Sequence, residues 1–288
     1  REIMRESLFF PGVEVKISSA NDDSRKQIQD IDSLLKQGVD LLVVAPNEAE
    51  SMTPIIEKAY RSGTPVVLVD RKTHSSRYTA YIGADNREIG RGIGNYIQQR
   101  LGGRGNIVEL TGLTGSTPAT ERHQGMMEEL AKSPGIEVLA TASAGWREAD
   151  AERAFDSILT RQPHIDMVIA QNDRMALGAY EAAKKRNRHK DILFVGVDAL
   201  SGAVNLVREG VLDASFIYPT AGDSLLQLAM HILRGEPYQK ENILSTALVN
   251  SENARVMQMQ TKHIETLDRK IEYLDQQLDT FLMRYSSQ

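Results

Sequence analysis

Polar and charged side chains stand after several apolar runs of this 288-residue chain. Among them are Asp70, Arg71, Asn172 and Asp198. Each hydroxyl of a sugar can donate and accept a hydrogen bond, so a carboxylate can accept from it while guanidinium and amide groups donate to it. Hydrogen bonds to charged groups contribute about 1.5–3 kcal/mol each, which is about twice the neutral value. These residue types favour binding of a polyhydroxylated small molecule.

Three further candidates stand near the ends of other apolar runs. Arg122 lies in a helical stretch that follows the loop 111–116, and Tyr218 comes directly after Ile217. Trp146, the only tryptophan, could cover the apolar face of a sugar ring or could be a buried core residue, and both interpretations stay open. For each charged candidate the alternative is a helix cap or a surface ion pair. Because the candidates occur in both halves of the chain, a shared ligand site explains them better than caps alone.

Residues for catalysis or metal binding do not follow any known pattern. The chain has no cysteine, which excludes disulfides and thiol catalysis, and its six histidines lack metal-ligand spacing such as HExxH. It also has no P-loop motif for phosphate binding. Gly90, Gly92 and Gly94 lie inside a helical stretch, where close helix packing explains them better than nucleotide binding. We expect a non-catalytic domain that needs no cofactor and no metal.

The composition is that of a folded domain with an acidic surface. Apolar residues make up 41% and charged residues 25%, and the formal net charge is −5. A nucleic-acid-binding surface would need a basic face, so we expect no nucleic-acid partner. No apolar run approaches the roughly 18 residues of a membrane span. The chain starts at Arg1 without a signal-peptide pattern, and we expect it to be a processed or truncated segment.

Short β-branched runs alternate with amphipathic helical stretches along the chain, the first helix being expected at 22–36. We predict strands at 13–18, 41–45, 66–69, 81–84, 106–110, 138–142, 167–170, 192–197 and 214–218. Most of these runs are apolar at every position, which is typical of strands buried on both faces of a parallel sheet. About nine strands are too many for one doubly wound sheet of ordinary size. The pattern predicts an α/β protein with two doubly wound parallel-sheet lobes.

The segment after Met257 has a different pattern. Its apolar positions alternate at intervals of three and four, which is the a/d seam of a coiled coil. They are Ile264, Leu267, Ile271, Leu274, Leu278, Phe281 and Tyr285. We predict a C-terminal coiled-coil or signalling helix over 256–288, with a homodimer formed through 257–285. The alternative is a terminal helix that packs on its own domain.

Several short segments carry a family resemblance. They are 69–71, 82–86, 119–122, 170–178 and 195–198, together with the loop that begins at Leu110. These segments resemble the type I periplasmic sugar-binding proteins, and within them the ribose-binding-protein-like branch. The similarity covers roughly residues 10–250. It implies two lobes joined by a three-strand hinge, a periplasmic location and a monosaccharide ligand.

The resemblance also implies a role for each candidate. Asp70 and Arg71 of one lobe should bind ligand hydroxyls, and so should Arg122, Asn172 and Asp198 of the other lobe. Trp146 takes the place of an aromatic residue that stacks on the sugar. Tyr218 stands where ribose binders have a glutamine, so the hydroxyl pattern that it reads should differ from that of ribose.

The family hinge implies discontinuous domains. The crossing strands should fall near 84–85, near Tyr218 and near 248–249. The expected N-terminal lobe comprises 1–84 and 219–248, the C-terminal lobe comprises 85–218 and 249–255, and the last helix covers 256–288. The family begins with a strand that this sequence does not show, because residues 1–10 already read as the end of the following helix. We expect that first strand to lie upstream of Arg1.

The long C-terminal helix separates two functional interpretations. Transport receptors of this family end soon after the last crossing strand, whereas the periplasmic sensor domains of Bacteroides hybrid two-component systems, particularly those for fructose, continue into such a helix. The favoured interpretation is a sensor in which sugar binding closes the hinge and moves paired helices that lead to a membrane-bound histidine kinase. The alternative is a soluble sugar-binding protein of an ABC transporter. A repressor effector domain would need a DNA-binding motif, and an enzyme would need a phosphate or metal site.

Overall fold

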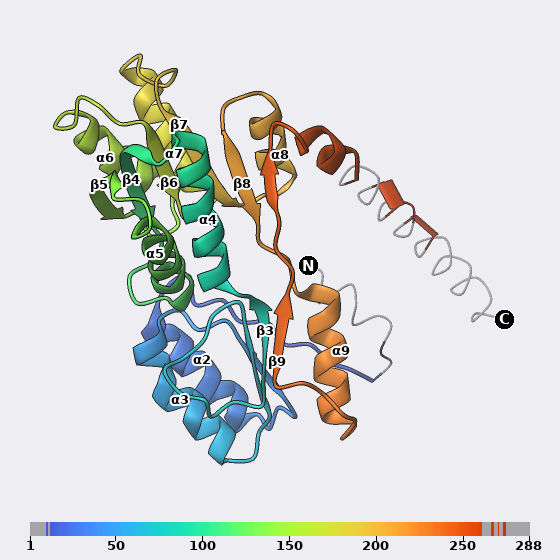
Figure 1. Ribbon diagram of the computed structural model, residues 1–288. Coiled ribbons are helices and arrows are strands. Elements are labelled where there is room, and N and C mark those ends of the chain that lie inside the picture. Colours follow the sequence, from blue (N-terminus) through green and yellow to red (C-terminus); the bar gives the residue numbers. More distant parts are fainter. Residues whose placement is uncertain (1–9, 11, 261–265, 268–269, 271–272, 275–288) are drawn as a thin grey trace.

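The computed structural model describes residues 10, 12–260, 266–267, 270 and 273–274 of the chain. They form two α/β lobes, each with its own sheet and with helices on both faces of that sheet (Figure 1). This arrangement confirms the predicted fold class. The described part contains no helix that is long and apolar enough to cross a membrane.

The N-terminal lobe has a parallel sheet in the order β1-β2-β3-β9. Its strands are β1 (Leu42–Val44), β2 (Val66–Val69), β3 (Ala80–Ala84) and β9 (Glu241–Leu244). Its helices are α2 (Ser24–Lys36), α3 (Ala49–Arg61) and α9 (Gly222–Leu233). Val66 and Leu68 pack in the core under α2 and α3, whereas Val67 and Ile82 pack in the core under α9. Because both faces are covered, β2 is apolar at every position.

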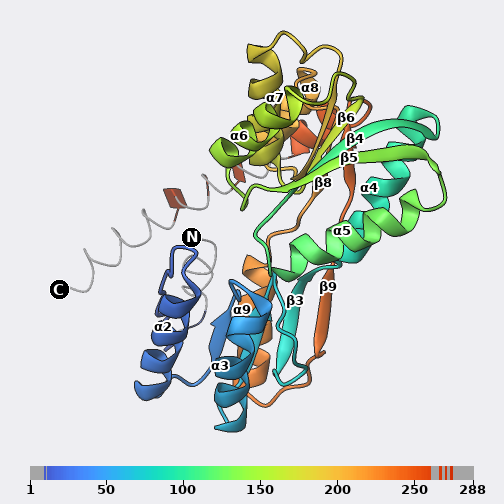
Figure 2. The same cartoon turned by 90° about the vertical axis from the view of Figure 1, so that its left-hand side faces the viewer.

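The C-terminal lobe has a sheet in the order β10-β8-β7-β6-β4-β5, in which only β10 is antiparallel to its neighbour. Its strands are β4 (Arg104–Thr111), β5 (Gly135–Ser143), β6 (Met167–Ala170), β7 (Leu193–Asp198), β8 (Ala214–Ile217) and β10 (Leu248–Asn250). Its helices are α4 (Asn86–Leu101), α5 (Thr117–Leu130), α6 (Glu148–Leu159), α7 (Asp173–Lys185) and α8 (Ser201–Arg208). Helices α4 and α5 cover one face of the sheet, and α6 and α7 cover the other (Figure 2).

The described part of the chain passes between the two sheets three times. It crosses from β3 into α4, from β8 into α9, and from β9 into β10 (Figure 1). These crossings lie where the hinge is expected. The carboxyl end of β2 in one sheet and those of β6 and β7 in the other are the places where a ligand between the lobes would meet polar groups.

Helices α4 and α5 pack backbone to backbone. A Cβ atom placed on Gly90 would stand 2.2 Å from the carbonyl oxygen of Arg122, and one on Gly125 would stand 2.1 Å from that of Arg87. A larger residue at either position would push the helices apart. The interpretation of the glycines at 90–94 by close helix packing is therefore confirmed. Because the backbone of Arg122 lies at this contact, the contact also fixes the position of Arg122 relative to α4.

One predicted strand is wrong. Residues 13–18 form no strand with any described part of the chain, and the side chain of Ile17 is 67% exposed. The segment is held instead by side chains, because the Ser18 hydroxyl donates to Asp30 at 2.7 Å. Its apolar residues resemble a strand in the sequence, but a strand also needs a neighbour for its backbone groups.

The other differences are at the C-terminal end. Strand β9 was not predicted, because only Ile243 and Leu244 of its four residues are apolar. Most of the predicted coiled coil 257–285 lies outside the described residues. Of its seam, Leu267 and Leu274 are described, and their side chains are 45% and 63% exposed. The exact domain boundaries stay predictions.

Candidate functional site

The seven candidate residues form one connected group between the lobes. Asp70 and Arg71 come from the N-terminal lobe, and the others come from the C-terminal lobe and the second crossing: Arg122, Trp146, Asn172, Asp198 and Tyr218. Their contacts reach across the gap. The guanidinium carbon of Arg71 lies 5.9 Å from the centre of the Trp146 ring, and the Tyr218 hydroxyl lies 3.1 Å from the Asp70 carbonyl oxygen.

Asp70 follows the last residue of β2 and has a φ of +61°. Its backbone N–H donates to the carbonyl of Ile82 at 3.0 Å, so the neighbouring strand holds this conformation. Burial raises the pKa of the Asp70 carboxyl, and the positive charges of Arg71 and Arg122 lower it. A half-buried carboxylate beside two guanidinium groups can accept hydrogen bonds from ligand hydroxyls while their positive charges balance its own.

Arg71 extends from the same turn. Its guanidinium donates to the carbonyl oxygen of Asn47 at 3.1 Å, which leaves further N–H groups for a ligand. Burial lowers its pKa, whereas the charges of Asp22 and Asp70 raise it. The Asn47 side chain in turn donates to Ser24 at 2.9 Å, so the Arg71 side chain rests on a fixed loop.

Arg122 is the most buried of the candidates, at 4% exposed. Its Nε donates to the side-chain oxygen of Asn86 at 2.9 Å, and its Nη1 donates to the carbonyl of Gln171. Its guanidinium carbon lies 4.9 Å from the centre of the Tyr218 ring and 5.7 Å from that of Trp146. Burial lowers the pKa of Arg122, and the charges of Tyr218 and Asp198 raise it.

Trp146 stands in the loop between β5 and α6 with a φ of +68°. A bulky residue in that region is rare, and such strain is frequent at binding sites. Its ring lies directly on Gly112, where an added Cβ would come within 2.1 Å of the ring atoms. Its indole Nε1 is buried and has no hydrogen-bond partner among the residues that the structure describes. Trp146 is half-buried and lies near both Arg71 and Arg122, so it belongs to the site as well as to the core edge.

Asn172 is the N-cap of α7. Its side-chain oxygen accepts from the N–H of Met175 at 2.8 Å, and its amide nitrogen donates to the carbonyl of Trp146 at 3.2 Å. The capping interpretation is therefore confirmed for this residue. One amide hydrogen remains for a ligand, because a primary amide has two.

Asp198 ends β7 with a φ of +116°. Burial raises the pKa of Asp198 to about 6, although the nearby charges of Arg122 and Arg174 lower it. The nearby Asp173 carboxylate accepts from the Ser215 hydroxyl at 2.6 Å and from the N–H of Ala199 at 2.7 Å. Burial raises the pKa of Asp173 to about 7.

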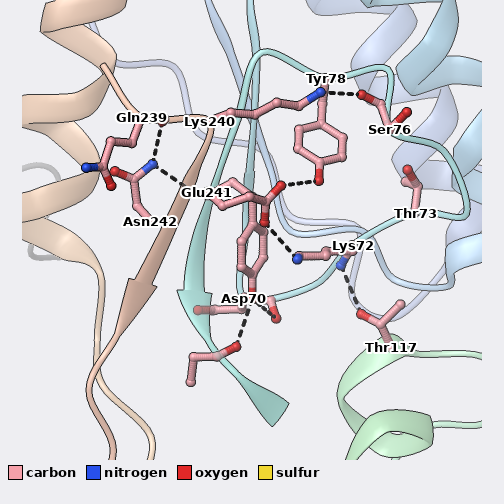
Figure 3. Close-up of polar contacts among 12 residues, drawn as sticks. Asp70, Lys72, Thr73, Ser76, Tyr78, Thr117, Gln239, Lys240, Glu241 and Asn242 are labelled. Atoms are coloured by element: carbon pink, nitrogen blue, oxygen red, sulfur yellow. Dashed lines mark hydrogen bonds and ion pairs between the residues drawn. The ribbon is translucent and has the colours of Figure 1, made fainter. Parts of the chain in front are cut away.

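Contacts at the rim join the lobes outside this group. The N–H of Ala49, at the start of α3, donates to the carbonyl of Gly115 at 3.0 Å. The N–H of Lys72 donates to the Thr117 hydroxyl at 2.9 Å (Figure 3). Beside them is a cavity of about 770 Å³ lined by both lobes, with Thr73 from one and Glu121 from the other. These contacts show the two lobes held together.

Sequence reasoning missed several residues that support the site. Asn86, Glu109, Gln171 and Asp173 are each at most 8% exposed, and each makes side-chain hydrogen bonds next to a candidate. The available signal was a charged residue, Glu109, inside the otherwise apolar run 107–110. A buried carboxylate in a strand requires partners, so it marks a polar network. Within the described part of the chain, no His, Asp or Glu side chains are grouped so as to hold a metal ion.

Comparison with known proteins gives the family. Residues 10–237 match the periplasmic binding protein domain. A xylitol-binding protein of Mycolicibacterium smegmatis is 31% identical over 276 residues, which cover 93% of this chain and 78% of that protein. A ribose import binding protein of Bacillus subtilis is 31% identical over 231 residues, which cover 80% of this chain and 74% of that protein.

Solved structures support the same family. The fructose-binding periplasmic domain of a hybrid two-component system is 57% identical and superposes with a TM-score of 0.93, covering 95% of this chain and 92% of that one. A galactofuranose-binding protein is 25% identical with a TM-score of 0.85, covering 91% of this chain and 92% of that one. This chain therefore belongs to the periplasmic binding protein domain family.

Proposed function

We propose that this chain is a periplasmic sensor domain that binds a monosaccharide, with fructose favoured, between its two lobes. The observation that carries the proposal is the convergence of Asp70, Arg71, Arg122 and Asp198 with Trp146. Two carboxylates and two guanidinium groups provide acceptors and donors for several hydroxyls, and the indole provides an apolar surface for C–H groups.

The similar proteins support the same class of ligand. Their names refer to fructose, galactofuranose, ribose and xylitol, which are all small polyhydroxylated compounds. Fructose is favoured because the 57% identical structure is a fructose-binding domain. The group at the site binds and orients hydroxyls, and we propose no chemical step on the ligand.

Binding is tested by equilibrium dialysis of the chain against radiolabelled D-fructose. We expect saturable binding of one sugar per chain in the micromolar range, typical of a few charged hydrogen bonds in a closed site. Unlabelled D-fructose should displace the label. Failure to bind at millimolar concentration would remove fructose as the ligand.

For signalling, we propose that closure of the lobes on the sugar moves a C-terminal helix that pairs with that of a second copy. A ligand shifts such an equilibrium only by its greater affinity for the closed state. The support is the a/d spacing of the helix, together with the exposure of Leu267 and Leu274. The helix would lead to a membrane-bound histidine kinase.

The alternative function is a soluble sugar-binding protein of an ABC transporter. It is favoured by the start of the terminal helix, which docks on the C-terminal lobe: Ala254 is 1% exposed, and the Gln258 side chain accepts from Arg208 at 2.7 Å. Sedimentation equilibrium separates the two functions. A dimer that dissociates in the Leu267→Glu/Leu274→Glu variant supports the sensor, whereas a monomeric wild-type chain supports the transport protein.

A further inference from the structure

A buried network lies beneath the C-terminal half of the site. Glu109, in the middle of β4, is 1% exposed, and so is Gln171, directly after β6. The amide nitrogen of Gln171 donates to the Glu109 carboxylate at 3.0 Å and to the carbonyl of Ala119 at 3.0 Å. The amide oxygen of Gln171 accepts from the N–H of Gly112 at 2.9 Å. Both amide hydrogens of Gln171 are thereby used by protein groups, so its side chain has no donor left for a ligand.

The second oxygen of the Glu109 carboxylate connects two more elements. The Nδ1 atom of His123, on α5, lies 2.7 Å from it, and the Thr141 hydroxyl, on β5, donates to it at 3.4 Å. One buried carboxylate thus connects β4, β5, α5 and the turn after β6. A buried charge is retained only where such partners hold it, so these elements have a fixed arrangement.

Three proposed ligand-binding residues are connected to Gln171, Arg122 and Asn172 directly and Trp146 through Gly112. Its backbone carbonyl accepts from Arg122. Its side chain fixes Gly112, on which the ring of Trp146 lies. Asn172 is the next residue in the chain and holds the carbonyl of Trp146. We infer that Gln171 and Glu109 form a positioning pair that sets the geometry of Arg122, Trp146 and Asn172 without touching the ligand. This inference rests on the proposed sugar-binding function.

The geometry also shows what the pair positions. Gly112 and Ala119 flank the loop that leads into α5, and Gln171 contacts both ends of it. If that loop shifted, the Trp146 ring would lose the surface beneath it, and Arg122 would turn with the first half of α5. Binding of a sugar depends on such placement, because a displacement of the order of 1 Å removes a hydrogen bond.

The test compares three variants. Gln171→Met keeps the volume and removes all side-chain hydrogen bonds of Gln171, and it leaves the Glu109 carboxylate with only its His123 and Thr141 contacts. Glu109→Met/Gln171→Met removes the carboxylate as well, and replacing both partners by apolar groups of similar shape can be nearly neutral for stability. Gln98→Met is the matched control, because Gln98 also makes a side-chain hydrogen bond in this lobe, a partly buried one to the carbonyl of Glu129.

We expect Gln171→Met to lower both the thermal midpoint and the affinity for D-fructose, the latter by at least about tenfold. In the double variant we expect the thermal midpoint to recover toward that of the wild type while the affinity stays at least about tenfold weaker. Gln98→Met should bind like the wild type. If affinity recovered together with the thermal midpoint, the pair would have only a structural role and the inference would be wrong.

A second readout works without any ligand. Trp146 is the only tryptophan, so intrinsic fluorescence reports directly on its surroundings. We expect the free Gln171→Met and double variants to show a shifted emission maximum and faster iodide quenching than the wild type and Gln98→Met. Unchanged emission in both variants would contradict the inference. If the wild type failed to bind D-fructose, the proposed ligand would be wrong, while this fluorescence result would still decide the positioning role.

Discussion

The Tyr218 hydroxyl donates a hydrogen bond of 3.1 Å to the backbone carbonyl of Asp70, which joins a residue of the second crossing to the end of β2 in the N-terminal lobe. The same carbonyl lies 3.5 Å from the Tyr81 hydroxyl. The Tyr218 ring also lies against Arg122, whose guanidinium carbon is 4.9 Å from the ring centre. Tyr218 therefore connects the two lobes, in addition to any contact with a ligand.

Tyr218→Phe removes this bond and keeps the ring. A neutral hydrogen bond contributes about 0.5–1.5 kcal/mol, so we expect the affinity for the sugar to fall by about 2- to 13-fold. Calorimetric titration measures this change, and Tyr238→Phe is the control because that side chain is 45% exposed at the far end of the N-terminal lobe. Unchanged affinity in Tyr218→Phe would mean that the bond does not contribute to closure.

Thr117→Val tests the contacts at the rim. The Thr117 hydroxyl accepts a hydrogen bond from the backbone N–H of Lys72, in the other lobe. Loss of this hydrogen bond should favour a form in which the two lobes are apart. We expect the ligand to dissociate faster, by about 2- to 10-fold, with little change in the association rate. Stopped-flow kinetics measures both rates. Thr160→Val is the control, since its hydroxyl donates only to Ser157 within the same lobe. Equal dissociation rates in wild type and Thr117→Val would contradict a role of this contact.

Arg71→Ala and Asp198→Ala remove charged groups of the site from opposite lobes. Each should lose two or more charged hydrogen bonds to ligand hydroxyls, which corresponds to an affinity loss of at least about 100-fold. The fold should remain, as judged by circular dichroism. The control is Asp156→Ala, which removes a carboxylate that pairs with Arg186 on the surface of the C-terminal lobe. This variant should bind the sugar with wild-type affinity. Wild-type affinity in Arg71→Ala or Asp198→Ala would remove that residue from the site.

Asp173 gives a prediction about pH. Burial raises its pKa from 3.8 to about 7, so the folded protein holds this proton more tightly than the unfolded chain. Its contribution to stability is present below about pH 4 and is lost as pH rises through about 7. We expect the free energy of unfolding in urea to fall over this range, and to fall less steeply in Asp173→Asn.

In Asp173→Asn, the remaining fall of the unfolding free energy with rising pH should come from Asp198. Burial raises the pKa of Asp198 to about 6, so this group changes stability in the same direction. Glu137→Gln, which changes an exposed carboxylate on β5, should leave the slope of the wild type unchanged. An Asp173→Asn variant with the full wild-type slope would show that this carboxyl is not the group that titrates.

Much of the fold follows from local patterns. The fully apolar runs at 66–69 and 167–170 became β2 and β6 with the predicted bounds, because strands buried on both faces have no polar positions. The run 13–18 alternates apolar and polar residues as a half-buried strand would, but it has no sheet partner in the described part of the chain, and partner choice is a tertiary property that local composition does not contain. Strand β9 was missed for the opposite reason, since it has sheet partners but only two apolar residues among its four.

The candidate ligand-binding residues could be chosen from the sequence, but most of the residues that hold them in place could not. Asp70 and Asp198 stand at strand ends in the sequence, and ligands of open α/β sheets bind beyond the carboxyl ends of the strands, here in each of the two sheets. Asn172 was open between a ligand contact and a cap, and only the bond from the N–H of Met175 shows the cap. Gln171 could not be assigned from sequence, because its role depends on three partners that are 52 to 62 positions away.

The central claim is that one monosaccharide binds between the lobes, and calorimetric titration with five sugars tests it most directly. The panel is D-fructose, D-ribose, D-glucose, D-galactose and L-arabinose, each titrated into the wild type and into Asp198→Ala. We predict micromolar binding of D-fructose with a stoichiometry of about one, weaker or no binding of the other four, and loss of binding in the variant. No heat of binding with any of the five sugars, or equal binding by Asp198→Ala, would contradict the account.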